Sequence, residues 1–266
     1  MGLLEVIESG GEVTKQHLAE EDLLSVVFES EELRKRGHLK VHLAEDLQEE
    51  FLLKNNDIDE NRMTTNGVKI NQVKISEQMW GIDRLLIEED TISNIIEHRN
   101  QAVADIKHAD LVSSNKISFL HKVIEKNDEN LYTIETLEGI VPGLTESTYQ
   151  YNGGKNFLGD HIEHHAAYSM NLHHGGAPKI WNIIAPQNYY QAIDTFTIIE
   201  EETVNMKGFV GICERTHTHR RMYRNLKNIP NIEFEIVVQN KGDLIILFPF
   251  TTHSVENKGQ NLLNAI

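Results

Sequence analysis

The sequence predicts a mainly β domain, a β-sandwich or barrel, that follows a helical N-terminal region. Hydrophobic residues make up 39% of the 266-residue chain and charged residues 25%, which is typical of a globular protein with a core. Apolar residues at helical spacing dominate the first part of the chain. From about residue 116, β-branched and aromatic runs alternate with Gly, Pro and Asn clusters, as in strands joined by turns. We therefore divide the chain into a helical, acidic region at residues 1–115 and a β domain at residues 116–266.

Helical spacing in the N-terminal region is clearest up to Gly37. Three basic residues precede this glycine, which stands where helices commonly end. Residues 75–99, where Trp80 and several leucines and isoleucines alternate with acids and amides, predict one or two further helices. The apolar positions that indicate the first helix are Leu18, Leu23, Leu24, Val27, Phe28 and Leu33.

Strand signals fill the second part of the chain. Short strands with close turn signals favour a sandwich or barrel over a βαβ sheet. Residues 240–242 read as the turn between the last two strands of the main group, and residues 261–266 read as a final strand in which the chain ends. The main group is predicted at residues 147–151, 167–172, 179–184, 195–203, 234–239 and 243–248.

Charge and composition narrow the classes of protein. The formal net charge of −16 argues against a protein that grips nucleic-acid phosphates and would attract a basic partner. The single cysteine, Cys213, cannot form an internal disulfide, which favours a reducing compartment. The first residues are acidic where a signal peptide is basic, and the longest apolar run, residues 244–250, is too short to cross a bilayer. We expect neither secretion nor a membrane role.

Histidines are abundant, with 14 in the chain, and several of them cluster at residues 161–174. His161 and Glu163 are two residues apart, so on a strand their side chains share a face. Neither zinc-protease pattern, H-E-x-x-H nor H-x-x-E-H, matches. A distant histidine that follows a predicted strand, His253, would complete two imidazoles and one carboxylate, the facial triad of non-haem Fe(II) oxygenases. Such a triad leaves positions open for a cosubstrate and dioxygen.

Three linked motifs carry a resemblance to a known family. They are His161-Ile-Glu163, the segment from Tyr168 to Trp181, and the run Gly-Asp-Leu-Ile-Ile-Leu-Phe-Pro at residues 242–249 that leads to His253. In order and spacing, roughly residues 118–266 resemble the JmjC (Jumonji) domain of Fe(II)- and 2-oxoglutarate-dependent oxygenases. The match is closest to histone lysine demethylases in which this domain is paired with a JmjN domain. The resemblance implies a double-stranded β-helix, a jelly-roll or cupin-like barrel.

The resemblance also implies roles for individual residues. The iron ligands would be His161, Glu163 and His253. Lys179 would pair with the distal carboxylate of 2-oxoglutarate, and Asn171 would hydrogen-bond the same cosubstrate. Tyr149 and Tyr151 resemble the tyrosines that wall a methyl-lysine pocket, where aromatic rings suit a methylated ammonium.

The chain also departs from the family pattern. His108 stands where a family tyrosine shares the cosubstrate carboxylate with the lysine, and residues 1–115 contain no recognisable JmjN segment. Cys213 and His219 match two ligands of a zinc site found in some relatives, but its other two cysteines would fall beyond Ile266. With one cysteine, this chain cannot complete that zinc site.

The activity implied by the resemblance is demethylation of N-methyl-lysine, by hydroxylation of the methyl group and release of formaldehyde. Its cofactors would be Fe(II), 2-oxoglutarate and dioxygen, its partner a methylated lysine peptide such as a histone tail, and its location the nucleus, with the cytoplasm as the alternative. Two other readings stay open: a JmjC hydroxylase of a non-methylated side chain, and a catalytically silent JmjC scaffold that binds chromatin. The position held by His108 favours the silent scaffold. Oligomeric state is left open by the sequence.

Overall fold

A computed structural model describes residues 2–54, 57–65, 109–114, 117–125, 147–152, 156–163, 166–195 and 232–266. The helices expected at residues 75–99, most of the strand expected at 195–203, and the residues His108, Cys213 and His219 lie outside these ranges. The division of the chain at residue 115 stays a prediction.

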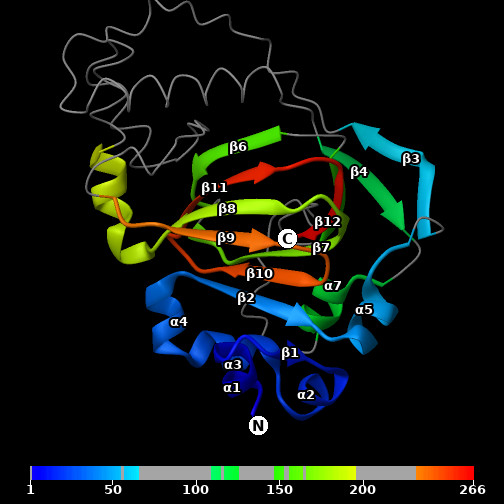
Figure 1. Cartoon of the computed structure of the whole chain (residues 1–266), viewed down its shortest axis with the longest axis horizontal. Coiled ribbons are helices and arrows are strands. Elements are labelled where there is room, and N and C mark those ends of the chain that lie inside the picture. Colours follow the sequence, from blue (N-terminus) through cyan, green and yellow to red (C-terminus); the bar gives the residue numbers. More distant parts are fainter. Residues whose placement is uncertain are drawn as a thin grey trace, which may run out of the picture.

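The described residues form two β-sheets, with helices against the outer face of the larger one (Figure 1). The large sheet has the strand order β1-β2-β10-β7-β12-β5-β4-β3, and the small sheet has the order β6-β11-β8-β9. The strands of the large sheet are β1 (Glu12–Val13), β2 (His38–Leu43), β3 (Ile58–Thr65), β4 (Ala109–Ser114), β5 (Thr148–Asn152), β7 (Ser169–Gly176), β10 (Asp243–Leu247) and β12 (Asn261–Ala265). Those of the small sheet are β6 (Asn156–His161), β8 (Lys179–Ile184), β9 (Glu235–Gln239) and β11 (Thr252–Asn257).

The helices are short, and several lie beside β2 in Figure 1. They are α1 (Leu3–Glu8), α2 (Lys15–Glu20), α3 (Leu23–Glu29), α4 (Glu31–Arg36), α5 (Glu45–Phe51) and α7 (Phe119–Glu125), with a 3-10 helix, η5 (Pro186–Asn188). Among the described helices, none is both long and apolar enough to cross a bilayer.

The two sheets make a cupin-like sandwich, so the expected double-stranded β-helix is confirmed in class but is not a closed barrel. Within the described residues no strand pairing joins the two sheets. The reason lies at β10, whose two edges are taken by β7 and by the N-terminal strand β2. The chain passes from β9 in the small sheet to β10 in the large sheet through the turn at residues 240–242. Gly242 allows this turn with a φ of +84°.

Two apolar clusters hold these layers together. One lies between the helices and the outer face of the large sheet, and it joins residues such as Leu24 and Val27 to Leu172 and Leu244. The other lies between the two sheets. Its members are Trp181, Ile183, Val237, Ile245, Leu247 and Val255. Neighbouring residues of one strand, such as Leu244 and Ile245, therefore face opposite clusters, as the two-residue repeat of a strand requires.

The single helix expected up to Gly37 is instead three helices. Asp22 and Ser30 interrupt it because their side chains cap new helices: Ser25 N donates to Asp22 Oδ2 at 2.9 Å, and Leu33 N donates to Ser30 Oγ at 3.3 Å. The end at Gly37 is confirmed, since this residue has a φ of +83° and its N–H donates to Leu33 O. The N-terminal region also supplies strands, which the helical description omitted.

Candidate metal centre

Three of the predicted ligands come together where two strands of the small sheet pair. His161 ends β6, His253 lies near the start of β11, and the two are direct partners in the antiparallel register. Their ring centroids are 4.2 Å apart, and His253 Nε2 lies 3.4 Å from Glu163 Oε1. One ligand atom from each residue lies within 4.8 Å of the other two. Within the described part of the chain, this is the only group of three or more His, Cys, Asp or Glu side chains that could hold a metal ion.

The protonation of the group suits metal binding. His253 is buried, and its Nδ1 lies 3.2 Å from the carbonyl oxygen of Thr251. A carbonyl only accepts, so Nδ1 donates in this contact, and Nε2 is the nitrogen that faces Glu163 and that binds a metal when it is not protonated. Burial alone would raise the pKa of Glu163, but its contacts with His253, His161 and Ser169 lower that pKa to about 2. Glu163 is therefore an anion near neutral pH.

The carbonyl that orients His253 is itself held by the N-terminal region. Thr251 Oγ1 donates to Gly37 O at 2.6 Å, and Phe248 N donates to the same oxygen at 2.9 Å. A side chain at residue 37 would meet Pro186 at 2.4 Å, so only glycine fits this contact. The end of α4 thus braces the segment that carries His253.

Lys179 provides a buried cation on the inner face of the small sheet. It is 6% exposed, and its Nζ lies 4.3 Å from the centroid of the Trp181 ring, which is in turn 5.7 Å from the His253 ring. Burial lowers the pKa of Lys179 to about 7, against the opposing effect of the Glu163 charge. Among the described residues no carboxylate lies within ion-pair distance of this amine. A buried amine without such a partner fits an anionic ligand.

Asn171 approaches from the large sheet. It lies on β7 opposite Ile245, a member of the cluster between the sheets, and its side chain is buried. Gln239 Nε2, on the small sheet, donates to Asn171 O at 2.7 Å and to Asn171 Oδ1 at 3.2 Å. Asn171 therefore points into the space between the sheets, on the side where Trp181 and Lys179 lie.

Tyr149 and Tyr151 are not brought to this space. They lie on β5 and cluster with Leu53 and Leu262, and the Tyr149 ring packs 5.4 Å from the ring of His174. In the register, Tyr149 pairs with Asn264, which pairs with Leu172 of the helix-facing cluster. The two tyrosines thus face the helices, on the side of the large sheet away from Asn171. Burial raises the pKa of Tyr149 to about 12, so it stays a neutral phenol.

Sequence reasoning missed Gln239 and Thr251, which contact the predicted residues. No motif marks either one. Gln239 could have been found from the alternation along β9, in which residues 237 and 239 are buried and their neighbours are exposed. The role of Thr251 depends on a contact with Gly37, which is distant in sequence and leaves no local signal.

The donor set matches the chemistry expected of iron. Two imidazole nitrogens and one carboxylate oxygen suit Fe(II) in a facial arrangement that leaves coordination positions open. In a comparison with protein families, residues 157–266 match the family described as "JmjC domain, hydroxylase". The matched segment includes the three candidate ligands together with Asn171 and Lys179. The C-terminal part of this chain is a JmjC domain.

Proposed function

We propose that the protein is an Fe(II)- and 2-oxoglutarate-dependent dioxygenase. The observation that carries this proposal is the His161–Glu163–His253 group with a buried, unpaired Lys179 on the same inner face. When bound, iron and cosubstrate supply oxidation by dioxygen: one oxygen atom enters a C–H bond of the substrate, and the other enters succinate as 2-oxoglutarate loses CO2. The three ligands would hold the ion from one side, and Lys179 and Asn171 would bind the cosubstrate.

The surroundings of these residues support binding of a small anion. Trp181, Ile183 and Val255 make an apolar wall between the sheets, and water excluded by such a wall cannot screen the charge of Lys179. Asn171 accepts from Gln239 through Oδ1, which leaves its Nδ2 group free to donate to a carboxylate. A cation and an amide donor are a suitable pair for 2-oxoglutarate.

N-methyl-lysine on a histone tail or another protein is our first candidate substrate, and the nucleus our first candidate location. Hydroxylation of an N-methyl group gives a hemiaminal, which releases formaldehyde and leaves the amine with one methyl group fewer. The support is the resemblance of the motifs to lysine demethylases. The second candidate, hydroxylation of a non-methylated side chain, is favoured by the position of Tyr149 and Tyr151, which cluster with Leu53 rather than with the metal group.

Incubation with Fe(II), 2-oxoglutarate and trimethyl-lysine peptides tests the proposal. Succinate together with formaldehyde would support demethylation. Succinate with a gain of one oxygen atom in a peptide, and no formaldehyde, would support hydroxylation instead. If saturating Fe(II) and 2-oxoglutarate give no succinate and do not raise the melting temperature, the protein is a silent scaffold, because a ligand that binds only the folded state must stabilise it.

Affinity for 2-oxoglutarate is expected to fall as the pH rises above about 7. The pKa of Lys179 is lowered to about 7, so above this pH a growing fraction of the amine is neutral and cannot pair with a carboxylate. The dissociation constant should rise by up to about tenfold per pH unit, as for loss of a single proton. Isothermal titration calorimetry of 2-oxoglutarate binding, with Mn²⁺ in place of Fe(II) and at several values from about pH 6 to 9, measures this dependence. Lys179→Met, neutral at every pH, should bind weakly without this dependence, and an equally steep dependence in that variant would contradict the assignment.

A further inference from the structure

Gln239, buried at the end of β9, lies at the meeting point of the residues assigned to the cosubstrate. It is fully buried and is the direct cross-strand partner of Lys179, so both side chains lie on the inner face of the small sheet. Its Oε1 accepts from Trp181 Nε1 at 2.9 Å, and Trp181 is the ring over which Lys179 Nζ lies. Gln239 therefore holds the indole ring against which the Lys179 ammonium group lies.

The other end of the Gln239 amide controls Asn171. Its Nε2 lies 3.2 Å from Asn171 Oδ1, 2.7 Å from Asn171 O and 3.1 Å from Asp243 O. All three partners are acceptors, so the nitrogen of Gln239 must face them. Because Asn171 Oδ1 accepts here, the Asn171 amide is turned with Nδ2 away from Gln239, and this Nδ2 makes no hydrogen bond with the described residues.

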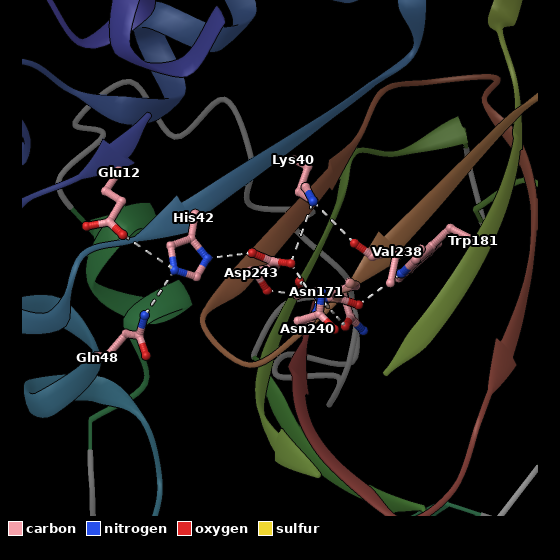
Figure 2. Close-up of polar contacts among 10 residues, drawn as sticks. Glu12, Lys40, His42, Gln48, Asn171, Trp181, Val238, Asn240 and Asp243 are labelled. Carbon is pink, nitrogen blue, oxygen red and sulfur yellow. Dashed lines mark hydrogen bonds and ion pairs between the residues drawn. The ribbon is translucent and has the colours of Figure 1, made fainter. Parts of the chain in front are cut away.

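The first residue of β10, Asp243, helps to keep Gln239 in place. Figure 2 shows Asn171, Trp181 and Asp243 converging from three strands. Asp243 Oδ2 accepts from Asn240 N at 2.8 Å and so closes the turn after Gln239, while Asp243 Oδ1 lies 2.6 Å from Nδ1 of His42 on β2. The turn is thus fixed from both sides, and the Gln239 amide has little freedom to rotate.

We propose that Gln239 is a positioning residue for the cosubstrate: it orients the Asn171 amide so that Nδ2 donates to 2-oxoglutarate, and it holds Trp181 beneath Lys179. This inference rests on the proposed function and adds to it a residue that touches neither the metal nor the cosubstrate. If Gln239 only filled space in the core, it would stabilise the fold without affecting the affinity for 2-oxoglutarate. A positioning residue affects that affinity through Asn171.

Gln239→Met tests the proposal, because the unbranched thioether fills a similar volume and offers none of the hydrogen bonds. We expect the dissociation constant of 2-oxoglutarate, titrated anaerobically with Mn²⁺ present, to rise by about tenfold, the equivalent of one hydrogen bond. Mn²⁺ affinity itself should be unchanged, because the three ligands are not altered. The control is Asn264→Leu, which also removes a fully buried amide but on the helix-facing side of the large sheet. This control should unfold at a lower temperature and bind 2-oxoglutarate as the wild type does.

A double-mutant cycle with Asn171→Ala separates positioning from general loosening. If Gln239 acts through Asn171, its replacement changes the 2-oxoglutarate affinity far less in the Asn171→Ala background than in the wild type. If Gln239→Met does not fold, Gln239→Glu takes its place in the cycle, because it keeps the acceptor for Trp181 and loses the donor to Asn171.

The outcomes are distinct. Wild-type affinity in the Gln239 variant, or independent effects of the two substitutions, would overturn the positioning role and leave the proposed function standing. A wild-type protein that binds Mn²⁺ but no 2-oxoglutarate at any concentration would overturn both.

Discussion

Replacement of His161 by alanine is expected to abolish 2-oxoglutarate turnover and one-to-one binding of a divalent metal. His161 is the ligand paired with His253 across β6 and β11, and its loss leaves only two donors. Two protein ligands bind a metal ion far more weakly than three. The substitution also removes one of the contacts that lower the pKa of the Glu163 carboxyl group. Metal content by mass spectrometry and succinate production measure the two effects.

The matched control for this variant is His121→Ala. His121 lies on α7 and is exposed, so the substitution removes an imidazole from outside the metal group. It should retain metal and turnover. Iron-dependent succinate production by the His161→Ala protein would refute the ligand assignment.

A chain that starts at residue 116 is expected not to fold. It would lack β2, which pairs along the whole of β10, and helices α1 to α5, which supply much of the apolar cluster on the outer face of the large sheet. Burial of one large aliphatic side chain contributes about 1.5–3 kcal/mol. The summed contribution of the side chains lost is therefore comparable to a whole domain's free energy of unfolding, typically about 5–15 kcal/mol. Buried side chains that would be removed include Leu3, Leu23, Leu24, Leu39, Val41 and Leu43.

Circular dichroism and urea denaturation of residues 116–266 test this expectation. Coexpression of residues 1–115 as a separate chain is the control, because it supplies the missing strand and helices without the covalent link. A cooperative urea transition in the isolated fragment would show that the boundary predicted from the sequence divides two independent units.

The candidate site was more predictable than its surroundings. The spacing of His161 and Glu163 is local, β8 is rich in isoleucine and tryptophan, and β10 carries a continuous apolar run, so these parts could be read from short segments. The strand β2 was missed although its residues 38–43 alternate polar and apolar, because six residues after a helix give a weak signal. The face of the sheet on which Tyr149 lies could not be read from a short segment. Which face a strand residue takes depends on the register of β5 against β12, which is set by residues more than a hundred positions away.

The pairing of β2 with β10 bears on how such a domain can be exchanged between proteins. A gene fusion that carried only residues 157–266 would transfer the three ligands, Asn171 and Lys179, but neither the edge partner of β10 nor the Gly37 oxygen that fixes Thr251 beside His253. The segment recognisable by its motifs is therefore smaller than the segment that can be transplanted in working order. Any recipient would have to donate a strand and a helix end of its own.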